Sequence, residues 1–73
     1  MTTNELKLCM DIYDISVVEY AIKRYSDIAD IFVNRINNYY VCKFFNCKYE
    51  VNQTMCEFDN FVIQALNSKD LLT

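Results

Sequence analysis

The first part of the chain alternates between apolar and polar residues, which is typical of a half-buried β-strand. The apolar positions are Leu6, Leu8, Met10 and Ile12, and the positions between them are Lys7, Cys9 and Asp11. A period of two places these sets on opposite faces of an extended backbone. We therefore expect a strand over residues 6–12 with one face against a core.

A helical period follows this strand. Ser16 and Glu19 have the spacing of a capping box, in which each side chain accepts from a backbone N–H at the helix start. Ile15 and Tyr20 have the spacing of a hydrophobic staple around the same start. An apolar stripe continues at helical spacing through Val17 or Val18, Ala21, Ile22 and Tyr25. The pattern predicts a helix over about residues 16–27.

Residues 31–36 and 39–45 are rich in the β-branched and aromatic residues that favour strands. Asn37 and Asn38 separate these segments, and asparagine tolerates the positive φ of a two-residue hairpin turn. Alternation places Tyr40, Cys42 and Phe44 on one face, and Tyr39, Val41 and Phe45 on the other. The pattern predicts a β-hairpin with apolar side chains on both faces. Asn46 is expected to begin a turn or bulge, before an extension of this strand or a short further strand at Cys47, Tyr49 and Val51.

A second helix is predicted in the last third of the chain. Thr54 and Glu57 form another capping box. The apolar stripe after it is Phe58, Phe61, Val62, Ala65 and Leu66. Asn67 is expected to end this helix in a left-handed conformation.

These elements have the order β-α-β-β-α and predict one small α+β domain over residues 1–73. We expect a single-layer antiparallel or mixed sheet of three to four strands, with two helices packed on one face. The ordered core is expected over about residues 5–67, with a frayed tail at 68–73.

Composition removes many functions. The 73 residues include no histidine, glycine or tryptophan, so the commonest general base and all glycine-rich phosphate loops are excluded. Lys and Arg number 7 against 10 Asp and Glu, and a net charge of −3 argues against a nucleic-acid partner. The sequence has neither a signal peptide nor a membrane-spanning apolar run, so we expect a cytoplasmic protein that does not bind membranes. So small a core often gains from a partner, which makes a homodimer a further expectation.

The four cysteines are Cys9, Cys42, Cys47 and Cys56. They lack the close pairs of zinc modules, and a reducing compartment keeps thiols free. We therefore expect small buried hydrophobic side chains with no metal and no cofactor, while thiolate metal binding and a redox or disulfide role stay open as alternatives.

Two segments resemble a known family. One is Ala21 and Ile22 followed by Tyr25 and Asp27, after a strand ending in Ile12 and Tyr13; the other is Glu57, Phe58, Asn60 and Ile63. With the β-α-β-β-α order, the chain resembles the small D-type proteins of His-Xaa-Ser peptide-modification systems (HxsD-like proteins) over about residues 6–66. Such proteins accompany radical SAM maturases of ribosomally made peptides. The resemblance implies a non-catalytic accessory protein that binds a precursor peptide, a radical SAM maturase or both.

The candidate partner-binding residues come from this resemblance and from the hairpin. They are Tyr25, Asp27, Phe32, Tyr39, Tyr40, Glu57 and Asn60. A free strand edge without proline can pair with an extended peptide, and aromatic side chains, including Phe44 and Tyr49, would form the pockets. About half of these aromatic residues are equally compatible with a place in the core. We expect Tyr40→Ala to leave the fold largely intact and to weaken partner binding.

Other functions stay open. Asp27, Asp30, Glu57 and Asp59 are the only plausible acid-base groups, and no nucleophile-base pair is evident, so we expect no enzyme activity. The main alternative is a small acidic inhibitor or decoy of a mobile element that blocks a nucleic-acid-binding protein, because the chain is small and acidic.

Overall fold

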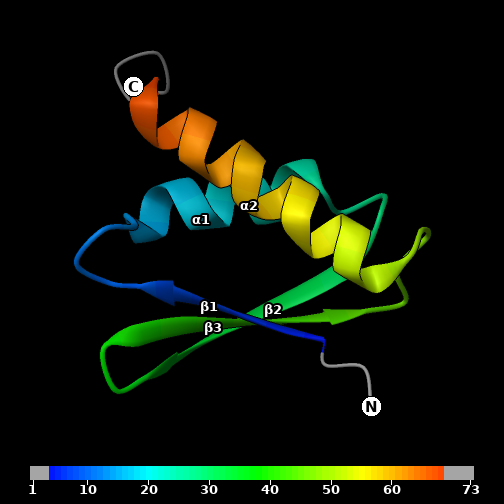
Figure 1. Ribbon diagram of the computed structural model, residues 1–73, viewed down its shortest axis with the longest axis horizontal. Coiled ribbons are helices and arrows are strands. Elements are labelled where there is room, and N and C mark those ends of the chain that lie inside the picture. Colours follow the sequence, from blue (N-terminus) through cyan, green and yellow to red (C-terminus); the bar gives the residue numbers. More distant parts are fainter. Residues whose placement is uncertain (1–3, 69–73) are drawn as a thin grey trace.

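The structure is a computed structural model that describes residues 4–68. The elements are β1 (Glu5–Cys9), α1 (Ile15–Arg24), β2 (Asp30–Ile36), β3 (Tyr39–Phe45) and α2 (Val51–Asn67). Both helices lie on one side of the sheet, and the other side carries no helix (Figure 1). The predicted α+β class and the β-α-β-β-α order are confirmed.

The sheet has the strand order β1-β3-β2, and both pairings are antiparallel. The long hairpin formed by β2 and β3 places β3 in the centre, because β1 pairs with its other edge. Asn37 adopts a φ of 56° in the two-residue turn between Ile36 and Tyr39, which confirms the predicted hairpin. Asn46 has a φ of 53° and turns the chain directly after β3, as the sequence predicts.

The first strand is shorter than the alternation suggests. β1 ends at Cys9, whose carbonyl accepts from the N–H groups of both Ile12 and Tyr13. These bonds close a turn, and Ile12 is left 69% exposed beyond the strand. Apolar alternation alone does not reveal this turn.

The first helix begins earlier than the capping box predicts. Asp14 is the N-cap, and its carboxylate Oδ1 accepts from the backbone N–H of Ser16 at 3.0 Å and from the Ser16 hydroxyl at 2.8 Å. Ser16 is therefore a residue of the first helical turn and not the cap. The Asp14 carboxylate accepts from an N–H group that has no partner within the helix. The helix ends at Arg24 with Tyr25 as C-cap, so Asp27 lies in the following turn.

The second helix also begins earlier than its capping box predicts. No strand lies between Phe45 and the helix start at Val51, so the predicted strand at residues 47–51 is wrong. Glu50 is the N-cap, and its carboxylate accepts from the N–H groups of Asn52 and Gln53, both at 2.9 Å. The buried Thr54 hydroxyl donates to the Glu50 carbonyl at 2.9 Å and so fits inside the helix. Asn67 is the last helical residue and not a left-handed one, and Ser68 caps the helix. Of the tail predicted at residues 68–73, Ser68 is the C-cap of the helix, and residues 69–73 lie outside the described residues.

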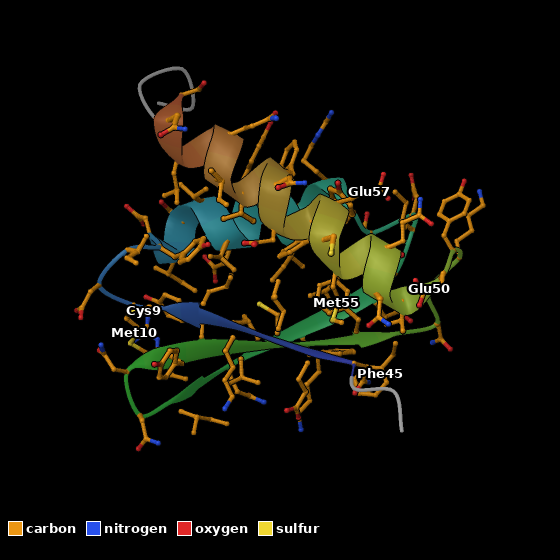
Figure 2. All side chains as sticks on the ribbon, in the orientation of Figure 1. Cys9, Met10, Phe45, Glu50, Met55 and Glu57 are labelled. Atoms are coloured by element: carbon orange, nitrogen blue, oxygen red, sulfur yellow. The ribbon has the colours of Figure 1, made fainter. Side chains whose placement is uncertain are left out.

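The core fills the space between the helices and the sheet. From β3, the even-numbered residues Tyr40, Cys42 and Phe44 point into it. The alternation predicts that these three share a face, but not that this face is the buried one. Phe58 of α2 is fully buried, and its ring packs edge-on against Phe44 with centroids 5.3 Å apart. Figure 2 shows Met55 between α2 and the sheet, whereas Phe45 lies on the opposite side of the sheet.

Candidate functional site

The outer edge of β2 carries main-chain groups that the sheet does not use. Antiparallel partners alternate between hydrogen-bonded and non-bonded pairs. The N–H of Phe44 donates to Asn4 and that of Met10 donates to Asn38, both at 2.9 Å, so even-numbered residues of β3 bond to β1. Odd-numbered residues of β3 therefore bond to the even-numbered residues of β2. The N–H and C=O groups of Ile31, Val33 and Arg35 consequently point outward.

A groove of about 680 Å³ lies between this edge and α1. Its lining on the strand is Ile31, Phe32 and Val33. Its lining on the helix is Ser16, Glu19, Tyr20, Ile22 and Lys23. The groove thus combines an apolar floor with outward main-chain groups, and the charged side chains of Glu19 and Lys23 stand on the helix.

Phe32 lies where the edge meets the open face of the sheet. Its side chain is 59% exposed, and its ring packs against Phe45 with centroids 5.7 Å apart. Tyr39 and Ile36 form a second exposed apolar pair at the hairpin end of the same face. Phe32 and Tyr39, both predicted as binding residues, are therefore available to a partner.

Tyr40 is not available. Its side chain is 7% exposed and lies in the core beneath the helices, with the Arg35 guanidinium 5.8 Å from its ring centre. Phe44 is buried in the same core, because both are even-numbered residues of the central strand. The expectation that Tyr40→Ala leaves the fold intact is wrong for this reason.

Tyr25 and Glu57 meet where α1 ends beside α2. The Tyr25 hydroxyl donates to the Glu57 main-chain carbonyl at 3.2 Å, and its ring packs edge-on against Phe58. Partial burial and the nearby Glu57 carboxylate raise the pKa of Tyr25. Glu57 does not cap the helix as predicted, because Glu50 does. The Tyr25 ring and hydroxyl thus join the two helices.

A smaller hollow of about 320 Å³ adjoins this contact. It is lined by Tyr25, Ile28, Tyr49, Gln53 and Glu57. Asp27 and Asn60, the other two binding candidates taken from the family resemblance, are exposed and are not among its lining residues. The structure thus brings together only one pair of these candidates.

One polar contact was not evident from sequence. The Tyr13 hydroxyl donates to Asp59 Oδ1 at 3.0 Å and ties the loop before α1 to α2. Burial, this hydrogen bond and the charge of Asp59 raise the pKa of Tyr13. The two residues lie 46 positions apart, and no local pattern connects them.

The four acidic candidates have separate surroundings. Asp59 accepts from Tyr13, and Asp30 accepts from the Asn46 side chain at 2.8 Å. Glu57 accepts from the Tyr25 hydroxyl through its main-chain carbonyl, and its carboxylate lies near enough to raise the pKa of Tyr25. Asp27 is exposed in the turn after α1.

The cysteines form no disulfide. All four are free thiols: Cys42 is buried, Cys9 and Cys47 are half-buried, and Cys56 is exposed. Burial raises the pKa of the Cys42 thiol to about 11. Over residues 4–68, no group of three or more histidine, cysteine or carboxylate side chains is placed to hold a metal ion. The expectation of small buried hydrophobic side chains is wrong for Cys56.

Comparison with known proteins gave no match among family models, curated proteins or solved structures. Within the described part of the chain, neither helix combines the length and the apolar character needed to cross a membrane.

Proposed function

We propose that this chain is a non-catalytic accessory protein that binds an extended segment of another polypeptide along the outer edge of β2. The observation that carries the proposal is the row of outward main-chain groups at Ile31, Val33 and Arg35 beside the groove under α1. An added strand would bond to these groups as β3 bonds to the other side of β2.

Such a strand would place its side chains alternately on the two faces of the sheet. Side chains on the helix side would enter the groove near Tyr20 and Ile22, and those on the other side would reach Phe32. Apolar residues at alternate positions would therefore be preferred, since both surfaces are largely apolar. Main-chain hydrogen bonds would supply affinity that depends little on the amino-acid sequence of the bound segment.

The family resemblance indicates the source of the segment. In that reading it belongs to a ribosomally made precursor peptide or to its radical SAM maturase, and this chain presents one to the other. The different hydrogen-bond partners of Asp30 and Asp59 support a binding role without acid-base chemistry, because general acid-base catalysis requires groups that converge on one reacting centre.

The edge is tested with peptides selected from a phage-displayed library of random linear sequences. Val33→Pro removes one outward N–H of β2 and leaves the bonds to β3 in place. Lys7→Pro is the matched control, because Lys7 is an odd-numbered β1 residue whose N–H points outward from the opposite edge. We expect Val33→Pro to weaken binding of the selected peptides by about tenfold or more, as measured by calorimetry, and Lys7→Pro to leave it unchanged.

Equal effects of the two substitutions, or no effect of Val33→Pro in a variant with native circular dichroism, would overturn the proposed edge. Capture from the native host followed by mass spectrometry then tests the source. A radical SAM maturase or a short precursor peptide supports the accessory role, and a nucleic-acid-binding protein supports the inhibitor alternative.

A further inference from the structure

We infer that, in the absence of a peptide, the β2 edge pairs with the β2 edge of a second copy of this chain, so that two sheets join across a two-fold axis at Phe32. An unprotected strand edge promotes unwanted association, and soluble proteins normally cover it. This inference goes beyond the proposed function. The second copy and the peptide use the same edge, so each excludes the other.

The strand register fits a symmetric pair. Antiparallel pairing about Phe32 sets Ile31 opposite Val33 of the second copy, and the reverse. Both residues direct their N–H and C=O groups outward, so the pairing joins groups that the sheet leaves unused. A register shifted by one residue would join residues whose main-chain groups already bond to β3. The allowed registers therefore include the one centred on Phe32.

The aromatic side chains favour this register. Phe32 would face its own copy as a non-hydrogen-bonded pair, the arrangement in which cross-strand side chains approach most closely. Phe32 is 59% exposed and already contacts Phe45, 5.7 Å away between ring centroids. Pairing would enclose Phe32 between Phe45 of its own chain and the symmetry-related ring.

Charge on α1 is complementary to itself about the same axis. Glu19 and Lys23 both line the groove, and neither forms an ion pair within residues 4–68. A two-fold axis perpendicular to the sheet sets the two α1 helices antiparallel on the same side. Residues 19 and 23 are equidistant from Ala21, so an axis that crosses α1 at Ala21 would set Glu19 opposite Lys23 of the second copy, and Lys23 opposite Glu19.

The groove relates the strand axis to the helix axis. Its strand lining, residues 31–33, is centred on Phe32, and its helix lining includes Tyr20 and Ile22, the residues on either side of Ala21. An axis at Phe32 therefore lies across the groove from the part of α1 that contains Ala21. The main-chain register and the charge pattern are thus compatible with the same partner, a second copy of this chain.

Charge exchange tests the inference by sedimentation equilibrium. Glu19→Lys sets lysines opposite one another at both symmetric contacts, and Lys23→Glu does the same with glutamates. We expect each single variant to raise the dimer dissociation constant by about tenfold and the double variant E19K/K23E to restore the wild-type value to within about threefold. Circular dichroism confirms that each variant is folded.

The outcomes separate this inference from the proposed function. A wild-type protein that is monomeric up to millimolar concentration, single variants that dimerise like the wild type, or a double variant without rescue would each overturn the dimer. A monomeric wild type that still binds a selected peptide, with loss in Val33→Pro, would leave the proposed function standing. A dimer that no selected peptide dissociates would overturn the proposed function and leave the dimer standing.

Discussion

Replacement of Phe58 by alanine should nearly abolish folding. The Phe58 side chain is fully buried, and its ring packs edge-on against Tyr25 and Phe44, with centroids 5.4 Å and 5.3 Å away. Truncation of a buried phenylalanine costs about 3–5 kcal/mol of folding free energy. The transfer free energy of the removed atoms is lost, and a cavity is left where the ring packed. A domain of 73 residues has a total stability of roughly 4–11 kcal/mol. The loss is therefore a large fraction of the whole.

Urea denaturation followed by circular dichroism measures this loss. Phe58→Leu keeps most of the volume and should cost about 1–2 kcal/mol, which gives a measurable transition if the alanine variant is unfolded. Ile63→Ala is the control on the same helix, since Ile63 is exposed, and it should cost less than about 1 kcal/mol. If Phe58→Ala lost no more than Ile63→Ala, the assignment of the buried face of α2 would be refuted.

Three further predictions address the caps, the thiols and the tyrosine contact. In urea denaturation, Asp14→Ala should lower the free energy of unfolding by about 1 kcal/mol and Ser16→Ala by less than half of that, because Asp14 is the N-cap. A larger loss for Ser16→Ala than for Asp14→Ala would show that Ser16 is the cap. In a thiol-titration assay, exposed Cys56 should react before buried Cys42, whose pKa is raised to about 11; equally fast reaction of Cys42 would contradict its burial. The folded-state pKa of Tyr13 is raised, so its contribution to stability is complete below about pH 10 and is lost as the pH rises through the folded value. Urea midpoints of Tyr13→Phe should therefore fall less steeply above pH 10 than those of the wild type, and identical slopes would contradict the contact.

The sequence predicts the parts of this fold that depend on local pattern. The hairpin at Asn37 follows from two strand-forming segments separated by a pair of residues that tolerate positive φ. The buried face of α2 follows from the spacing of Phe58 and Val62. The helix starts were misplaced because acidic residues upstream, Asp14 and Glu50, supply the caps in preference to the serine and threonine.

The candidate site was predictable only in part. The strand edge and the exposure of Phe32 and Tyr39 are compatible with the sequence pattern, but alternation cannot say which face of β3 the helices cover. Tyr40 was misjudged for that reason. The groove between α1 and β2 depends on how the helix packs on the sheet, and Tyr13 meets Asp59 only through tertiary structure.

Amide hydrogen exchange, resolved by residue and measured at a dilution where the protein is monomeric, tests the central claim that the β2 edge binds an extended segment. In the free protein, the N–H groups of Ile31, Val33 and Arg35 should exchange fast, and those of Phe32 and Asn34 slowly. A selected peptide should slow the exchange of the first set. Unchanged exchange at Val33 in the peptide complex, or slowing at the β1 edge instead, would contradict the account.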